Sequence, residues 1–233
     1  PLDHPLVARH PEGFAVRHSG ERGRPVDPRR NLPSTGTAIA RLRMTEFQAE
    51  FAVELRDRLV ELVGLGAGGF RLAPGVRIPA DWLGPLMATL RSSHPDLRFI
   101  AGPPDGDRTA AVALGQAGCD YLVSSFAWWD LAAPWFAEEL RELSFAAPVL
   151  CEITAEQAAA EPQAILTRLQ AAGALGSGII VPVPLAGEVA TSGAIETAGE
   201  FASLRGEGRP LSEGVSPVAA LLGAGHAGLR EAD

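Results

Sequence analysis

A regular alternation of amphipathic helices with short apolar strands constrains the fold more than any other feature of this sequence. Strands of four to six residues are predicted at 69–72, 97–101, 120–123, 148–151 and 178–183. Each run is short, mostly apolar and follows a helical pattern. Such strands are typical of parallel sheets, whose strands are covered by helices on both faces.

Helices are predicted before these strands, at 45–62, 80–90, 108–117, 134–143 and 155–172. The first places Phe47, Phe51, Leu55, Leu59 and Leu62 on one face, at spacings of three and four residues. Gly118 and Gly173 are predicted to end two of the helices. Two closing helices are predicted at 195–204 and 217–222.

The predicted fold class is α/β, with a parallel sheet and flanking helices. Right-handed crossovers between consecutive parallel strands give either a TIM-type barrel or an open sheet, and the periodicity leaves both possible. The predicted organisation is a loop-rich N-terminal segment over 1–34, the (β/α) region over 35–222 and a flexible tail over 223–233.

Charge excludes several kinds of partner. The formal net charge is −8, and the 20 basic residues are scattered rather than gathered in a stripe, so neither nucleic acid nor an anionic membrane surface is predicted as a partner. All 20 are arginine. Because Schiff-base aldolases, pyridoxal enzymes and Walker-type phosphate sites need a lysine amine, those mechanisms are excluded. No cofactor and no metal site are predicted.

The sequence contains neither a long apolar span nor a secretory signal pattern, and cytoplasmic localisation is therefore predicted. The first residue is Pro rather than Met, which raises the expectation of a longer parent protein. Cys119 and Cys151 stand beside apolar runs and are predicted to be buried free thiols rather than a disulfide.

One glycine motif resembles a nucleotide-binding signature. Residues 64–69 read Gly-Leu-Gly-Ala-Gly-Gly and match the spacing G-x-G-x-x-G. A dinucleotide site needs a strand before the motif and a helix after it, whereas here a helix comes first. The segment is predicted to be a helix C-cap and a turn into the next strand.

Several separated segments carry motifs that recur, in this order and at this spacing, in one known family. The first is Asp-His-Pro-Leu-Val-Ala-Arg-His-Pro-Glu-Gly-Phe at 3–14. The next are Gly-Phe-Arg-Leu-Ala at 69–73, followed by Pro79 and Trp82, and His-Pro-Asp-Leu-Arg-Phe-Ile-Ala-Gly at 94–102. The last are Gly-Cys-Asp-Tyr-Leu at 118–122 and Trp-Trp-Asp at 128–130. Together these segments resemble the α-amylase clan, glycoside hydrolase family thirteen, and most closely its bacterial maltosyltransferases that use maltose 1-phosphate to extend α-1,4-glucan. Gly13 stands where that family has a Trp.

This resemblance implies that the five predicted strands correspond to strands four to eight of a (β/α)8 barrel. A partial barrel leaves two strand edges open, so the resemblance also implies a missing N-terminal segment or a partner chain that covers them. The alternative is that the strands close on themselves or form an open sheet.

The resemblance aligns the family's catalytic positions with residues that lack carboxyl groups. The nucleophile position is Ala73 and the acid/base position is Gly102, while Thr154 falls near a third conserved Asp, in an alignment that can slip by one residue. Retaining glycosidases and transglycosylases need two carboxyl groups. A pseudoenzyme, with no catalytic residue at these positions, is therefore predicted.

Residues for substrate binding are predicted at or after the strand ends: Arg71, Trp128, Trp129, Asp130 and Glu152. Each has a plainer alternative. Arg71 corresponds to the family arginine that pairs with the nucleophile, and here it is predicted to meet another acceptor, a bound anion or strand-end carbonyls. Trp128 and Trp129 are adjacent, so at most one can line a cleft, and both can be core residues. Asp130 and Glu152, like Asp105 and Asp107, can be solvated loop carboxylates.

Three functions follow. The first is a degenerate, non-catalytic α-amylase-like domain that binds α-glucan or maltooligosaccharide or supports a larger assembly. The second is an active glycoside hydrolase or glycosyltransferase of the clan with relocated carboxylates. The third is an unrelated aldolase-type barrel with a phosphate site at 173–178, which ranks last.

Overall fold

The computed structural model describes residues 3–16, 38–42, 45–72, 78–102, 107–131, 133–155 and 165–181. The chain divides into two compact units, Pro1–Asp120 and Tyr121–Asp233. The predicted closing helices and C-terminal tail lie outside the described residues. Among the helices that are described, none is long and apolar enough to cross a membrane.

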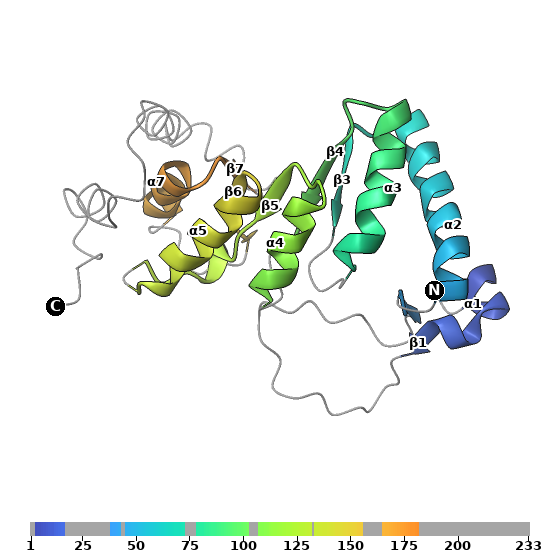
Figure 1. Cartoon of the computed structure of the whole chain (residues 1–233). Helices are drawn as coiled ribbons and strands as arrows, with labels where there is room; N and C mark the ends of the chain where they lie inside the picture. Colours follow the sequence, from blue (N-terminus) through green and yellow to red (C-terminus); the bar gives the residue numbers. More distant parts are fainter. Residues whose placement is uncertain are drawn as a thin grey trace. The chain divides into compact units, whose positions relative to one another are not determined.

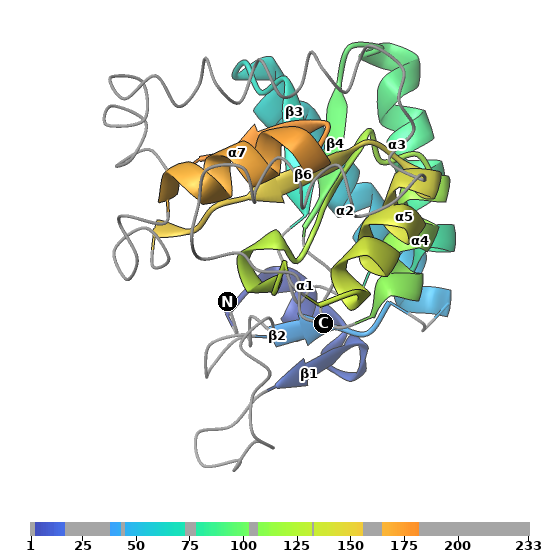
Figure 2. The ribbon, with the colours of Figure 1, turned by 90° about the vertical axis from the view of Figure 1, so that its left-hand side faces the viewer.

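The first unit begins with secondary structure where a loop-rich segment was predicted. Helix α1 (Pro5–Arg9), the 3-10 turn η1 (Pro11–Gly13) and strand β1 (Phe14–Val16) follow one another, and β1 pairs antiparallel with β2 (Ala38–Ala40) (Figure 2). Leu6, Leu42 and Phe47 form a buried cluster under these elements. Elements this short show too little periodicity to be predicted from the sequence. In the structure, burial against Phe47 stabilises them.

The structure leaves no room for a side chain at Gly13. A Cβ atom built on Gly13 would lie 2.7 Å from the ring of Phe47. Phe47 is buried and packs edge-on against Phe14, with ring centroids 4.8 Å apart. Because Phe47 occupies the space that a side chain at position 13 would need, glycine is the residue that fits there.

The remainder of the first unit alternates helix and strand as predicted. It contains α2 (Thr45–Gly64), β3 (Gly69–Leu72), α3 (Ala80–Ser93), β4 (Arg98–Ala101) and α4 (Arg108–Gln116). Strands β3 and β4 are parallel, with Leu72 opposite Ala101. Helix α3 packs against α2 and against α4, and it lies side by side with α2 (Figure 1). It buries an apolar face at helical spacing, formed by Leu83, Leu86, Met87 and Leu90.

The glycine motif is a helix C-cap, as predicted. Gly66 has φ of 103°, and the amide of Ala67 donates to the carbonyl of Leu62. A left-handed residue after the last helical turn, with backbone amides bonded to the last carbonyls, is the usual way to end a helix. These amides are engaged in the helix end, so the motif is not a phosphate-binding turn.

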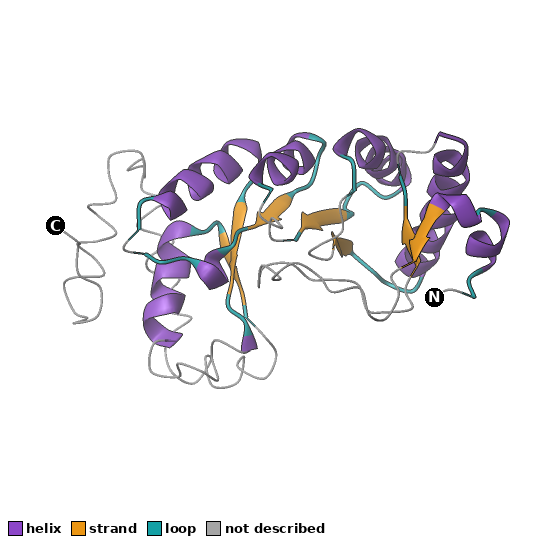
Figure 3. Ribbon diagram, turned by 90° about the horizontal axis from the view of Figure 1, so that it is seen from below, coloured by secondary structure: helices purple, strands orange, loops and turns teal. Residues whose placement is uncertain are grey.

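The second unit also alternates strands and helices, which Figure 3 distinguishes by colour. It contains β5 (Tyr121–Val123), η2 (Phe126–Trp128), α5 (Trp135–Ala146), β6 (Val149–Glu152), α7 (Ile165–Leu175) and β7 (Gly178–Ile180). Strand β6 pairs in parallel with β5 and with β7. The core of the second unit includes Val123, Leu143 and Val149, each almost fully buried. Cys119 in the first unit and Cys151 in the second are buried free thiols, which confirms that prediction.

The described pairings from β3 onward are parallel and join consecutive strands within each unit. They confirm the α/β class with flanking helices, and consecutive parallel pairing is what a partial (β/α) barrel requires. The helix end predicted at Gly173 is wrong, because α7 continues to Leu175. Gly173 is buried inside this helix rather than at its end.

Candidate functional site

The carboxyl ends of the parallel strands carry most of the residues predicted for the site. In the first unit, Arg71 is the third residue of β3 and Gly102 directly follows β4. The register of Leu72 with Ala101 brings the two strands to the same edge. Ala73, the position of the family's nucleophile, and Asp105 lie outside the described residues. Arg71 and Gly102 thus lie near the carboxyl ends of two paired strands.

Arg71 stands on β3 with its side chain exposed. An exposed guanidinium keeps its hydration, so this position carries no large desolvation cost. Gly102 is half-buried and has no side chain to donate a proton.

Asp107 has a structural role. It is the N-cap of α4, and its Oδ1 accepts a hydrogen bond of 3.1 Å from the amide of Ala110. Capping by an aspartate satisfies one of the unpaired amides of the first helical turn. The plainer reading, a loop carboxylate without a catalytic task, therefore fits Asp107.

In the second unit, Glu152 and Thr154 stand at the end of β6. Glu152 is the last residue of the strand, is partly buried and lies opposite Ile180. The amide of Ile153 donates to the carbonyl of Ile180 over 2.9 Å, so the pairing with β7 continues to this point. Thr154 follows and is partly buried.

The two adjacent tryptophans separate as predicted. Trp129 is 3% exposed, with its ring centroid 5.4 Å from Phe126 and 5.4 Å from Phe136. Trp128 is 47% exposed. Trp129 is therefore a core residue, and Trp128 is the one whose indole is available to a ligand. Asp130 comes next and is exposed.

Sequence reasoning missed a buried polar group between β5 and α5. Ser124, Ser125 and Glu139 are each at most 3% exposed, and the amide of Ser125 donates to Oε1 of Glu139 over 2.7 Å. Within the described part of the chain, Ser125 Oγ and Trp129 Nε1 are buried without a hydrogen-bond partner. The signal was present, because Glu139 falls on the apolar face of its helix with Phe136, Leu140 and Leu143.

The phosphate site considered for residues 173–178 does not fit the structure. The amide of Gly176 donates to the carbonyl of Ala172, and the amide of Ser177 donates to the carbonyl of Val149 over 2.6 Å. These donors are already used inside the unit, and they lie before β7 rather than after it. The aldolase-type hypothesis depended on this phosphate site and is therefore not supported.

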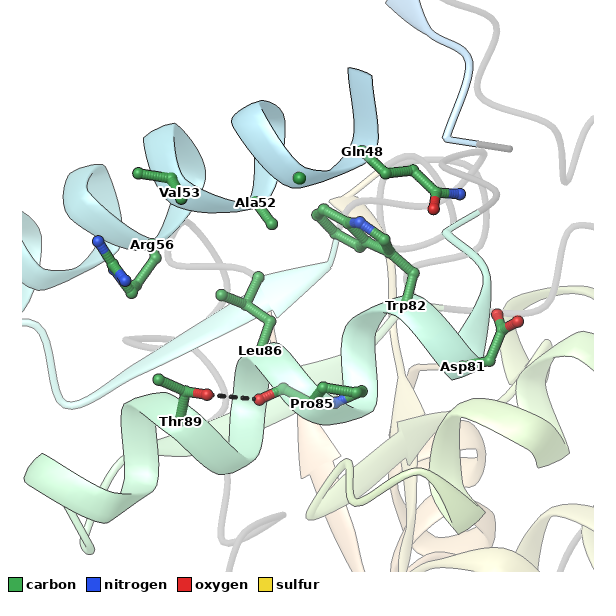
Figure 4. A pocket seen from close by; sticks show the side chains of 10 residues that line it. Gln48, Ala52, Val53, Arg56, Asp81, Trp82, Pro85, Leu86 and Thr89 are labelled. Atoms are coloured by element: carbon green, nitrogen blue, oxygen red, sulfur yellow. Dashed lines mark hydrogen bonds between the residues drawn. The ribbon is translucent and has the colours of Figure 1, made fainter. Parts of the chain in front are cut away.

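Within the described ranges, no three His, Cys, Asp or Glu side chains gather as metal ligands. A groove with a volume of about 400 Å³ lies between α2 and α3 and is lined by none of the residues predicted for substrate binding (Figure 4). Gln48 and Trp82 are among its lining residues. Trp82 was noted in the sequence for its spacing, but nothing in the sequence placed it beside Gln48.

No family model matches the chain. Among known proteins, the α-1,4-glucan:maltose-1-phosphate maltosyltransferase of Burkholderia pseudomallei (strain K96243) is 34% identical to it over 194 residues. The match covers 78% of this chain and 17% of that protein, so the chain spans a small part of this relative's length. The similarity supports the α-amylase-like relationship that the motifs predicted, with a maltosyltransferase as the relative.

Proposed function

We propose that the chain is a non-catalytic, α-amylase-like domain that binds α-glucan or maltooligosaccharide and supports a larger assembly. The observation that carries this proposal is the pair Ala73 and Gly102, which occupy the positions of the nucleophile and the acid/base in the sequence resemblance. The relative is named as a maltosyltransferase of α-1,4-glucan and maltose 1-phosphate, and this name supplies the ligand class.

The chemistry explains why these two positions matter. Retention at an anomeric carbon needs one carboxylate to form the glycosyl ester and a second carboxyl to protonate the leaving oxygen, roughly 5 Å apart. The methyl group of Ala73 cannot form the ester, and Gly102 has no proton to give. Loss of groups that act as a unit removes several orders of magnitude of rate and leaves only binding and positioning.

Binding remains chemically possible at the strand ends of each unit taken separately. The exposed indole of Trp128 can stack on the apolar face of a pyranose ring, and the guanidinium of Arg71 can donate to sugar hydroxyls. Both features support a domain that holds glucan without cleaving it.

The test is an assay of the purified chain for maltosyl transfer from maltose 1-phosphate and for hydrolysis of maltoheptaose, with the maltosyltransferase relative as positive control. The expected result is no turnover above background, together with measurable heat on titrating maltoheptaose in a calorimeter. Turnover by the unmodified chain contradicts the non-catalytic proposal, and absence of binding heat contradicts its glucan-binding part.

A second candidate is an active enzyme of the clan with relocated acids. It is favoured by Glu152, which ends β6, and by Asp130, which follows the neighbouring parallel strand β5. If the second candidate holds, the assay shows turnover, and this turnover disappears in Asp130→Ala or Glu152→Ala. Cytoplasmic localisation remains a prediction of the sequence.

A further inference from the structure

The α2–α3 groove is the feature that the strand-end site does not use. We define it by Gln48, Val53 and Arg56 on α2 and by Asp81, Trp82 and Thr89 on α3 (Figure 4). A second hollow of about 440 Å³ adjoins it and shares Gln48, Asp81 and Trp82. Volumes of this size suit a small organic ligand.

Trp82 provides a fixed aromatic surface in the groove. Its indole points from α3 toward α2, and its ring centroid lies 5.7 Å from that of Phe51 (Figure 4). Trp82 is partly buried, so one part of the ring packs on the core while another borders both hollows. An aromatic ring already held by packing loses little conformational entropy when a ligand stacks on it.

The polar groups around this ring suit a neutral ligand rich in hydroxyl groups. Asp81 adds a carboxylate and Arg56 a guanidinium, but Nε and Nη2 of Arg56 already donate to Oδ1 of Asp57 over 2.9 and 2.7 Å. The hydroxyl of Thr89 donates to the carbonyl of Pro85 and keeps lone pairs for accepting. Because Arg56 is already paired and Asp81 adds a negative charge, the lining does not favour a phosphate or another anion.

We propose that the α2–α3 groove is a glucan-binding subsite outside the strand ends, in which Trp82 stacks on a glucose ring of an α-1,4-linked chain. The inference rests on the proposed function, which supplies the ligand class, and it adds where the glucan is held. An aromatic face together with groups that can bind hydroxyls suits a sugar ring.

Two valines of α2 provide a matched pair of variants. Val53 lines the groove and is 48% exposed, while Val60 lies two turns further along the same helix, is 42% exposed and does not line it. In Val53→Arg the long side chain enters the groove, whereas Val60→Arg adds the same charge elsewhere. Both positions are exposed, so both variants are expected to fold. Trp82→Phe is a third variant, which keeps an aromatic ring against Phe51.

The experiment measures maltoheptaose binding to the full chain by titration calorimetry, with circular dichroism to check folding. Val53→Arg is expected to weaken binding about tenfold or more, Trp82→Phe to weaken it severalfold, and Val60→Arg to change it by less than about twofold. Cellohexaose, with β-1,4 linkages, is expected to bind more weakly than maltoheptaose.

The outcomes separate this inference from the proposed function. If the unmodified chain binds maltoheptaose and Val53→Arg binds equally well, the glucan contacts the chain elsewhere and the groove proposal falls while the proposed function stands. Equal losses in Val53→Arg and Val60→Arg also overturn the groove, and equal binding of cellohexaose overturns the α-1,4 assignment. If the unmodified chain binds no maltoheptaose, the glucan-binding function itself falls.

Discussion

At the scale of single residues, Gly118 shows how one position depends on backbone geometry. It follows α4 with φ of 112°, and a Cβ atom built there would lie 3.3 Å from Nη1 of Arg91. Arg91 also donates to the carbonyl of Gly118 over 2.8 Å. A side chain at this position is therefore strained by its φ angle and disturbs the guanidinium that holds the loop.

We predict that Gly118→Ala lowers the free energy of unfolding by about 1–2 kcal/mol. The control is Gly64→Ala at the end of α2, where a Cβ atom would meet nothing within 4 Å and alanine is expected to be neutral or slightly stabilising. Urea unfolding followed by circular dichroism measures both. Equal stability of the two variants would show that the loop after α4 does not need glycine.

At the scale of elements, Asp120 joins α3, β4 and the end of the loop after α4. Its Oδ2 accepts hydrogen bonds from Nη2 of Arg91 over 2.6 Å and from the amide of Phe99 over 2.7 Å, and its Oδ1 accepts one from Arg98 over 3.2 Å. Burial alone raises the pKa of Asp120, but the hydrogen bonds from Phe99, Arg98 and Arg91 outweigh it and hold the pKa below its ordinary value. The carboxylate is thus stabilised in its charged form.

A depressed pKa makes the contribution of Asp120 dependent on pH. The stabilisation is fully present above the ordinary pKa of an aspartate and is lost as the pH falls through the lower pKa of the folded state. We predict that Asp120→Asn destabilises the protein by about 1 kcal/mol at pH 7, and that the difference from the unmodified chain shrinks below about pH 4.

Denaturant unfolding at several pH values measures this difference. The matched control is Asp57→Asn, whose exposed carboxylate pairs with the neighbouring Arg56 over 2.7 Å and is expected to contribute little at any pH. A difference between Asp120→Asn and the unmodified chain that stays constant from pH 7 to pH 3 argues against the charged hydrogen bonds as its origin.

At the scale of the whole molecule, the net charge of −8 leads us to expect no binding to nucleic acid. A chain with this charge and no basic stripe gains nothing from releasing counterions of a nucleic acid. We predict no shift of duplex DNA or single-stranded RNA in a gel assay at physiological ionic strength. A shift that weakens with added salt would reveal a basic surface that the net charge hides.

The sequence by itself determined the types of most described elements and the chemistry that the family's positions lack. Helical spacing from Phe47 to Leu62 predicted α2, short apolar runs predicted the strands, and the residue types at 73 and 102 excluded carboxyl chemistry there. These features are local, because helix periodicity and side-chain composition need no knowledge of distant neighbours. Even so, Gly173 misled the prediction, since a buried glycine inside a helix and a helix-ending glycine look alike in sequence.

Only the tertiary structure decided which side chains meet and which face solvent. It buried Trp129 and exposed Trp128, left Arg71 exposed, and set Gln48 of α2 beside Trp82 of α3. Exposure and contact depend on elements that pack together from distant parts of the chain, and a pattern read along one element does not contain that information.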